Sequence, residues 1–562
     1  MKQGYFSFVL HSHLPYVRKA GRWPHGEEMI HEALAETYIP LLNALFDLKR
    51  EGIEPRLTIG LTPILLEQIA DPEVGAHFEL YVQEEIEVAR KDLDRFSGSG
   101  QARLRAVAEF YLHWYEQILD SYEHRYGRDV VGAFRRLRDD GNLDVITSAA
   151  THGYLPLLER DSSIYAQLKV GVAATNRHFG HAPSGIWLPE CGYRPAYYAA
   201  DNHRRKPGIE DFLADLNLLF FFTDTHVIEG GELVGKVVGD VHGPYGGLPQ
   251  RELATWPDPR PESQSRTILR PYYVQSTRVA VLGRDARTGQ QVWSANTGYP
   301  GDPEYREFHR KDPTSGLQFW RITGGEVGLG DKDVYDADRA LARTEAHADH
   351  FVNLVTQISR QHFEQHGSAG LIVSAYDTEL FGHWWFEGVT WLKSVLRRLA
   401  ANEDVGLCSV SEYLEQYPPD SVMSLPESSW GAGGNHWTWL NPQTEWLWPL
   451  IHAAERKMES LVEEFPSADG ARLAALNQAG RELLLLESSD WPFLVSTGQA
   501  KEYANARFQQ HLARFNRLGL LLAAGRLGPD EEHFIRVTAD VDNPFPDLDY
   551  HVFAARESTV PS

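Results

Sequence analysis

A short apolar run stands at residues 186–193, Ile186-Trp187-Leu188-Pro189-Glu190-Cys191-Gly192-Tyr193. It ends in one carboxylate, Glu190, and then turns at Gly192 and Pro195. This pattern predicts a buried strand whose last residue is acidic, followed by a loop. In parallel β/α architectures, reactive side chains collect at the carboxyl ends of the strands. Glu190 is therefore a candidate catalytic residue, although a carboxylate in this position can also form a salt bridge or cap a loop.

A second stretch has the same form. It consists of the apolar run Leu371-Ile372-Val373-Ser374-Ala375-Tyr376, then Asp377, then the aromatic-rich segment 378–385. Two strand-end carboxylates with aromatic neighbours indicate an acid/base or nucleophile pair that acts on a sugar. Glycosyl transfer with retention needs two carboxyl groups roughly 5–5.5 Å apart, one to attack the anomeric carbon and one to protonate the leaving oxygen. Glu190 and Asp377 suit these roles if both strand ends face the same barrel mouth.

The chain supplies further strands of this kind. Residues 5–10 and 56–60 predict strands, and apolar residues at helical spacing predict a helix over 27–50 between them. This strand–helix–strand order is typical of a parallel sheet. The remaining strands of the predicted α/β barrel are expected at 143–148, 185–190, 218–223, 278–282 and 371–376.

Shifts in composition divide the chain into parts. A long, charged, helix-favouring segment without strand signals predicts a helical subdomain inserted into the barrel. Helical spacing returns after the last strand and predicts a C-terminal helical domain, and we expect the polar final stretch to wrap loosely over the surface. The expected parts are 1–80 and 142–409 for the catalytic barrel, 81–141 for the insert, 410–530 for the C-terminal domain and 531–562 for the tail.

Composition restricts the partners and the compartment. The 562-residue chain has a formal net charge of −24, so it lacks the basic face that nucleic acid or an anionic membrane requires. Only two cysteines, no signal peptide and no apolar run of membrane-spanning length favour a cytoplasmic protein. The 15 Trp, 24 Tyr and 25 Phe include rings that can stack on pyranose faces, although core packing accounts for many of them.

Histidines follow two of the predicted strands. His11 and His13 come after residues 5–10, and His152 comes after residues 143–148. Three such histidines could bind zinc as neutral imidazoles, could hydrogen-bond sugar hydroxyls, or could serve packing alone. Spacing cannot show the partners that would orient zinc ligands, so these interpretations stay open. Because covalent catalysis by carboxylates requires no metal, we expect neither a metal nor a cofactor.

Five stretches of the chain resemble the five motif regions of glycoside hydrolase family 57. They are His11–Pro15, Thr151–Tyr154, Trp187–Tyr193, Ala375–His383 and Ser488–Trp491. Within that family, the chain is similar to the 1,4-α-glucan (glycogen) branching enzymes, and this resemblance extends to about Ala524. The runs that carry it are Phe8–Lys19, Val279–Ser294, Gly298–Asp302 and Tyr305–Phe308.

The resemblance implies a (β/α)7 barrel, incomplete relative to the eight-stranded form, with a helical insert and a C-terminal helical domain. It implies that Glu190 is the nucleophile and that Asp377 is the general acid/base. The residues it places around the substrate are His11, His13, His152 and Asp490 at the donor site, Trp293, Trp430 and Trp439 (with Trp437 beside it) in the glucan groove, Trp23, and Tyr245 at the tip of a glycine-flanked loop over the site.

The predicted function is that of a retaining branching enzyme, a hexosyltransferase that cleaves an α-1,4 linkage through a covalent intermediate. It would transfer the chain to a glucose 6-hydroxyl and hydrolyse some of it. The implied partners are amylose, amylopectin and glycogen as donor and acceptor, and the enzyme is expected to be a monomer. The alternatives are an α-amylase or 4-α-glucanotransferase on the same fold, a metal-dependent glycosidase that uses the histidines, and a non-catalytic glucan-binding protein.

Overall fold

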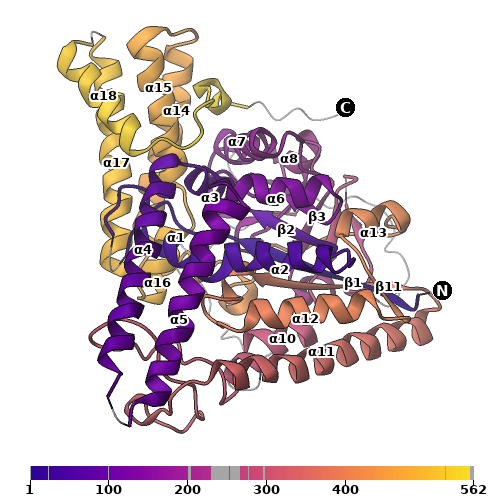
Figure 1. The fold of residues 1–562 in the computed structure, drawn as a ribbon. Coiled ribbons are helices and arrows are strands. Elements are labelled where there is room, and N and C mark those ends of the chain that lie inside the picture. The colour runs from indigo at the N-terminus through magenta and orange to yellow at the C-terminus, as the bar shows by residue number, and fades with distance from the viewer. Residues whose placement is uncertain are drawn as a thin grey trace.

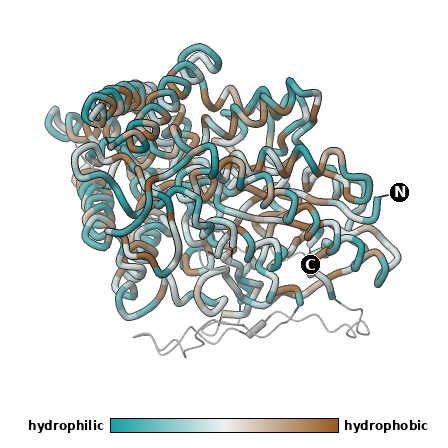
Figure 2. Tube along the Cα trace, turned by 60° about the horizontal axis from the view of Figure 1, so that its bottom comes forward, coloured by the Kyte–Doolittle hydropathy of each residue, from teal (hydrophilic) through white to brown (hydrophobic). Residues whose placement is uncertain are grey.

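Parallel strands occupy the centre of the molecule, helices surround them, and a stack of C-terminal helices lies at one side (Figure 1). The computed structural model describes residues 2–22, 25–98, 100–199, 204–229, 252–253, 266–275, 277–294, 298–525 and 527–556. Along the helices, hydrophilic and hydrophobic residues alternate in Figure 2, a pattern typical of amphipathic helices. No helix in the described ranges combines the length and the apolar composition that crossing a membrane requires.

The described residues contain seven parallel strands that close into a barrel. Their order is β11-β1-β2-β3 on one side and β10-β7-β4 on the other. The halves are joined where Thr147 N–H donates to the Gly185 carbonyl at 3.1 Å and Asp285 N–H donates to the Val373 carbonyl at 2.9 Å. This confirms the predicted (β/α)7 barrel. The strands are β1 (Gly4–Ser12), β2 (Leu57–Leu61), β3 (Leu143–Ile146), β4 (Gly185–Ile186), β7 (Phe220–Thr223), β10 (Ala280–Gly283) and β11 (Gly370–Asp377).

Alternation along the strands separates two apolar layers. On β1, Val9 belongs to a small cluster inside the barrel, with Ile146, Phe222 and Val373 from other strands. Its neighbour Phe8 points to the other side and joins the larger core between strands and helices. Successive side chains of a strand face opposite sides of a sheet, and both sides are covered here. This is why the strands read as nearly continuous apolar runs in the sequence.

Helices cover the outside of the barrel, and the helix predicted over 27–50 is present in three pieces. α1 is followed by a π-helical turn, Leu34–Tyr38, which leads directly into α2. Most of the other covering helices follow a strand in the sequence, as in β/α units. The helices around the barrel are α1 (Glu28–Ala33), α2 (Ile39–Arg50), α3 (Pro63–Ile69), α6 (Val130–Asp139), α7 (Asp161–Phe179), α8 (Ile209–Asp215), α9 (Thr225–Glu229), α10 (Ala286–Trp293), α11 (Ala337–His366), α12 (Gly388–Ala400) and α13 (Val410–Gln416).

Short strands supplement the barrel. β12 (Val405–Leu407) pairs with the first residues of β1, and β9 (Tyr272–Val274) lies antiparallel to β10. The other short strands are β5 (Tyr197–Tyr198), β6 (Arg205–Lys206), β8 (Glu252–Leu253) and β13 (Val422–Met423).

Two long helices between β2 and β3 form a hairpin that extends away from the barrel (Figure 1). They are α4 (Pro72–Arg95), which is capped by the Asp71 side chain, and α5 (Ala102–Asp120). α4 begins before residue 81, and α6 contacts the barrel elements β3 and α7. The independence of this insert, and its bounds at 81–141, stay a prediction.

The C-terminal helices stack beside the barrel and hold its first loop. Tyr16 Oη donates to the Val541 carbonyl at 3.1 Å, and Asn543 N–H donates to Tyr16 Oη at 3.3 Å. The last residues of the stack therefore contact the segment that follows β1. The helices are α14 (Leu447–Glu464), α15 (Gly470–Leu486), α16 (Asp490–Thr497), α17 (Lys501–Ala523) and α18 (Pro529–Val541).

The prediction that the final stretch wraps loosely over the surface was wrong for its described residues. α18 occupies Pro529–Val541, and Phe545, Tyr550 and Phe553 beyond it are buried in the core. Arg481 Nε also donates to the Pro544 carbonyl at 2.9 Å. A few aromatic anchors outweigh the polar composition of this stretch, because each buried ring removes a large apolar area from water.

Candidate active site

The sequence pattern predicted that Glu190 ends a strand. In the structure, Glu190 lies on a strained turn that follows the strand. β4 ends at Ile186, and a 3-10 turn, Pro189–Cys191, follows it. Glu190 has φ 60° and Cys191 has φ 48°, both in the left-handed region. Such residues cost of order 1–3 kcal/mol each and cluster at active sites. Beyond β4, Pro189 has no N–H to donate to a neighbouring strand, so strand pairing does not extend to Glu190.

Residues from far along the chain hold the Glu190 carboxylate. Trp430 Nε1 donates to Oε2 at 2.6 Å, and Trp430 N–H donates to the Glu190 carbonyl at 3.0 Å. Ser489 Oγ donates to Oε1 at 3.4 Å, and His152 Nδ1 lies 3.9 Å from the same oxygen. Both carboxylate oxygens are therefore oriented by protein donors, as a positioned nucleophile requires.

Asp377 ends β11 and lies in register with His11 of β1. Burial raises its pKa to about 7, and the nearby Arg284 guanidinium opposes that rise. Burial likewise raises the pKa of Glu190 to about 7, the hydrogen bond from Trp430 lowers it, and the charge of Asp377 raises it. Two such carboxyl groups that repel each other as anions favour the state with one ionised and one protonated. That is the starting state of a nucleophile and a general acid.

The three predicted histidines come together beside Glu190. His11 Nε2 lies 3.1 Å from His152 Nε2, and the His13 and His152 rings stack with centroids 3.9 Å apart. His13 Nε2 lies 3.1 Å from Asp490 Oδ1. Burial lowers the pKa of both His11 and His152 well below the usual value, so both are uncharged. Neutral imidazoles in this arrangement can exchange hydrogen bonds with hydroxyl groups.

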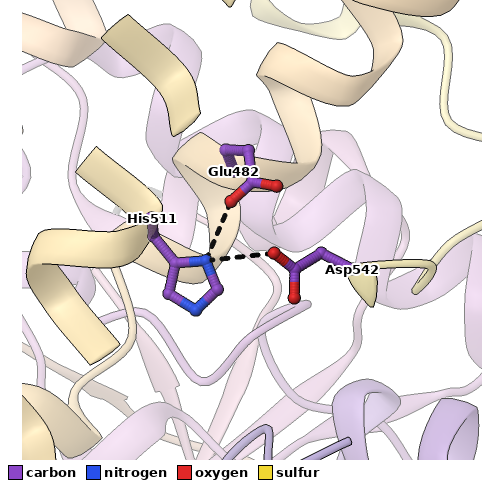
Figure 3. Close-up of side chains that lie close together, drawn as sticks. All are labelled: Glu482, His511 and Asp542. Carbon is purple, nitrogen blue, oxygen red and sulfur yellow. Dashed lines mark hydrogen bonds and ion pairs between the residues drawn. The ribbon is translucent and has the colours of Figure 1, made fainter. Parts of the chain in front are cut away.

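A different trio has the composition of a metal site. Glu482 of α15, His511 of α17 and Asp542 after α18 bring three possible ligand atoms within 4.8 Å of one another (Figure 3). His511 Nδ1 lies 2.8 Å from Glu482 Oε2, a hydrogen-bond distance, and Arg514 already pairs with Asp542. Two ligands of one zinc ion lie farther apart, at about 3.3 Å for tetrahedral bonds of 2.0–2.1 Å. Burial raises the pKa of Glu482 and lowers that of His511, so the trio is a buried, hydrogen-bonded cluster that links the C-terminal helices.

The predicted aromatic residues occupy different environments. Trp430 lies at Glu190, whereas Trp439 is 1% exposed and stacks on Tyr154 with ring centroids 4.3 Å apart. Trp293, at the end of α10, is 41% exposed, and Trp437 is 39% exposed. Trp23 and Tyr245 lie outside the described residues.

Sequence analysis missed Arg284, Asp224 and Ser489 as components of the site. Arg284 donates from Nε to Asp224 Oδ1 at 3.0 Å, and its guanidinium lies 5.4 Å from the centre of the Trp430 ring. Asp224 and Arg284 each stand directly after a barrel strand, β7 and β10. The strand-end criterion that selected Glu190 and Asp377 would have selected these two as well. Ser489 follows no strand and precedes a helix, and its only signal in the sequence is its place in the motif Ser488–Trp491, next to Asp490.

Replacing Trp430 with phenylalanine should weaken the nucleophile. Trp430→Phe removes the indole donor to Glu190, so the pKa of Glu190 should rise. A carboxylate must be ionised to attack, so the acidic limb of the kcat/KM profile should lie at a higher pH in the variant than in the wild type. The loss of a hydrogen bond to a charged group should also lower kcat/KM about 10- to 100-fold. The measurement is kcat/KM between pH 5 and 9. Trp446→Phe, which removes an exposed indole that donates to Gln443, is the control, and an unchanged acidic limb in Trp430→Phe would contradict the expectation.

The chain belongs to glycosyl hydrolase family 57, whose family model matches residues 7–426. A second model, described as the C-terminal part of 1,4-alpha-glucan branching enzymes, matches residues 450–553. The first match covers the barrel, and the second covers the helical stack that supplies Ser489 and Asp490. The two models together span both sides of the site.

Individual relatives agree with these matches. The chain is 44% identical over 548 residues to the 1,4-alpha-glucan branching enzyme TK1436 of Thermococcus kodakarensis, covering 97% of this chain and 77% of that protein. The crystal structure of TK1436 in complex with glucose superposes with a TM-score of 0.89 at 43% identity, covering 99% of this chain and 97% of that one. The alpha-amylase AmyC of Thermotoga maritima superposes with a TM-score of 0.82 at 31% identity, covering 99% and 100% of the two chains.

Proposed function

We propose that this chain is a retaining 1,4-alpha-glucan branching enzyme. The observation that carries the proposal is the pair of partly buried carboxyl groups at the mouth of one barrel. Glu190 is held by donors from the C-terminal part, Asp377 ends β11, and burial raises both pKa values to about 7. A match to the C-terminal part of branching enzymes supports the choice of acceptor.

In the first step, an ionised Glu190 oxygen attacks C1 of an α-1,4-linked glucose. The C1–O4 bond breaks, and Asp377 gives its proton to the departing O4. The C1–oxygen bond to Glu190 holds the transferred chain as a covalent intermediate. Trp430, through its hydrogen bond to Oε2, keeps one carboxylate oxygen fixed so that the other can attack.

In the second step, Asp377 acts as a base. It accepts the proton of the 6-hydroxyl of another glucan chain while O6 attacks C1 and Glu190 departs. The product is an α-1,6 branch, and the protonation states of both carboxyl groups are restored. Retention of the α configuration follows because the two displacements each invert C1.

The substrate-binding roles belong to the same proposal. His11, His13, His152 and Asp490 would contact the donor glucose, because their side chains surround Glu190. Trp430 would stack on a sugar near the cleavage point. The assignments of Trp293, Trp439, Trp23 and Tyr245 to the glucan groove and its loop rest on the family resemblance alone.

We propose that the partners are α-1,4-glucans, as donor and acceptor, with some hydrolysis as a side reaction. The net charge of −24 disfavours nucleic acid as a partner. We also propose that the enzyme is a monomer and that it works in the cytoplasm.

A second candidate is an α-amylase, because the barrel of AmyC superposes on this chain over almost its whole length. The carboxylate chemistry would be the same, with water in place of the 6-hydroxyl in the second step. Only the acceptor distinguishes the two functions, so the product must be analysed.

Incubation with linear amylose separates the two candidates. For a branching enzyme, reducing ends should stay nearly constant during the reaction and rise strongly after the product is treated with a debranching enzyme. The rise reports α-1,6 linkages that the amylose did not contain. An increase in reducing ends before debranching, without further gain afterwards, would mean that water is the acceptor and would overturn the branching assignment.

A further inference from the structure

A third buried carboxyl group, Glu379, lies two residues after Asp377 in the 3-10 turn Thr378–Leu380. Its side chain is 6% exposed. Ser12 Oγ and Thr378 Oγ1, 2.7 Å apart, fix this turn against the end of β1. The chemistry described so far leaves Glu379 without a role.

One oxygen of Glu379 is firmly held. Tyr38 Oη donates to Oε1, and His13 N–H donates to the same atom at 3.1 Å. Tyr38 is the last residue of the π-helical turn Leu34–Tyr38, a type of segment frequent at functional sites. Oε1 therefore has its full complement of donors and cannot serve as a donor itself.

The other oxygen is available. Among the described residues, no other residue donates to Oε2, and it is not one of the sealed, unpartnered polar atoms either. It therefore retains access to solvent, although the side chain is almost buried. Water can therefore reach Oε2 in the free enzyme, and a glucan hydroxyl can take the place of that water when substrate binds.

The segment that carries Glu379 is held in place by its neighbours, and this fixes the position of Oε2. Glu36 of the π-helical turn pairs with Arg306 at 2.8 Å and with His383 at 3.0 Å. A Cβ at Gly382, where φ is 105°, would lie 1.8 Å from the Glu36 carbonyl oxygen. Only glycine allows this close approach, so the segment after Asp377 is locked against the π-helical turn.

We propose that Glu379 is a substrate-contacting residue whose protonated Oε2 donates a hydrogen bond to a glucan hydroxyl beside Asp377. The inference rests on the proposed branching chemistry and adds a third carboxyl group to it. In this role Glu379 stays neutral throughout the cycle, and it binds and orients the sugar without exchanging its proton.

The charges around Glu379 support a neutral state. Burial raises its pKa to about 8, and the negative charge of Asp377 adds to the rise. The titratable groups that face it are Tyr38, Asp377 and His13, whose imidazole is paired with Asp490. The next charged groups, Glu36, Arg306 and His383, pair with one another.

This role predicts a particular pH dependence. Above pH 7 the general acid Asp377 loses its proton, and above pH 8 Glu379 loses its own. If both protons are needed, the slope of log kcat/KM against pH steepens from −1 toward −2 in the pH unit above about pH 8, because two ionisations then reduce activity. Glu379→Gln is permanently neutral and can donate an N–H from the position of Oε2, so its slope should stay at −1.

The experiment compares kcat/KM on amylose from pH 5 to 10 for four proteins: the wild type, Glu379→Gln, Glu379→Ala and Glu387→Gln. Glu387→Gln is a matched control, because its Oε1 also accepts from a tyrosine, Tyr335, at 2.7 Å and from a backbone N–H, that of Arg306, at 3.1 Å. Its Oε2, however, is sealed, and the residue is 1% exposed. Glu387→Gln should keep the slope of −2.

Glu379→Ala should lose about tenfold or more in kcat/KM at pH 6, since it cannot donate at all, whereas Glu379→Gln should stay within about threefold of wild type. A slope of −2 that persists in Glu379→Gln, or a slope of −1 in the wild type, would overturn the inference. The thermal unfolding temperature of each variant shows whether a loss of activity comes from the missing contact or from a destabilised fold. If the products carry no α-1,6 linkages while the slopes behave as expected, only the choice of acceptor fails, and Glu379 keeps its role.

Discussion

Replacement of Glu190 with glutamine abolishes glucan transfer: kcat on amylose should fall on the order of 10⁴-fold or more, because the amide cannot form the covalent bond to C1. The fold should survive, since glutamine has the same shape and its amide oxygen can still accept from Trp430 Nε1. The measurements are the rate of branch formation and the thermal unfolding temperature. Near wild-type turnover in Glu190→Gln would show that another group attacks C1.

An activated substrate gives the same variant a sharper test. A maltosyl fluoride carries a leaving group that departs without a proton, so it bypasses the general acid but still needs the nucleophile. Glu190→Gln should therefore remain inactive on α-maltosyl fluoride. Activity on the fluoride with none on amylose would mean that Glu190, and not Asp377, supplies the proton.

Replacement of Asp377 with asparagine should give the opposite pattern. On amylose, kcat should fall about 10²- to 10⁴-fold, the usual contribution of a general acid or base. On α-maltosyl fluoride, the first step should proceed at close to the wild-type rate, because fluoride needs no proton. The second step should then stall, since no base activates the acceptor, and the covalent intermediate on Glu190 should accumulate.

Mass spectrometry of the intact protein detects that intermediate as an added maltosyl group. Wild-type enzyme mixed with the fluoride is the control, because it turns the intermediate over and should carry little of it. If Asp377→Asn is equally slow on amylose and on the fluoride, without an adduct, Asp377 positions the substrate and a different residue donates the proton.

The barrel could be predicted from the sequence because its signals are local. Each strand is a short apolar run with a polar residue or a turn at its carboxyl end. The runs are continuous because both faces of the sheet are buried, so they can be located without an alternating pattern of apolar and polar residues. β11, for example, occupies Gly370–Asp377, and the apolar run at 371–376 predicted it almost to the residue. The same signal located Asp377 within the site.

The conformation at Glu190 could not be predicted in this way. The strand pattern continues through Trp187 and Leu188, and nothing local indicates that the backbone turns left-handed at Glu190. That conformation persists because Trp430, 240 residues later, holds both the carbonyl and the carboxylate. Contacts between such distant segments leave no periodic trace in the sequence, which is also why Ser489 was missed.

The composite origin of the site has a consequence for the order of protein synthesis. A ribosome makes the barrel strands first, and the donors that hold Glu190, from Trp430 and Ser489, emerge only after the last strand. Val541 and Asn543, which hydrogen-bond to Tyr16 in the segment after β1, emerge later still. An unfinished chain therefore holds both carboxyl groups without the contacts that orient them. The oriented form of Glu190 is therefore complete only once translation has passed Ser489, which couples the assembly of the nucleophile to the synthesis of the helical stack.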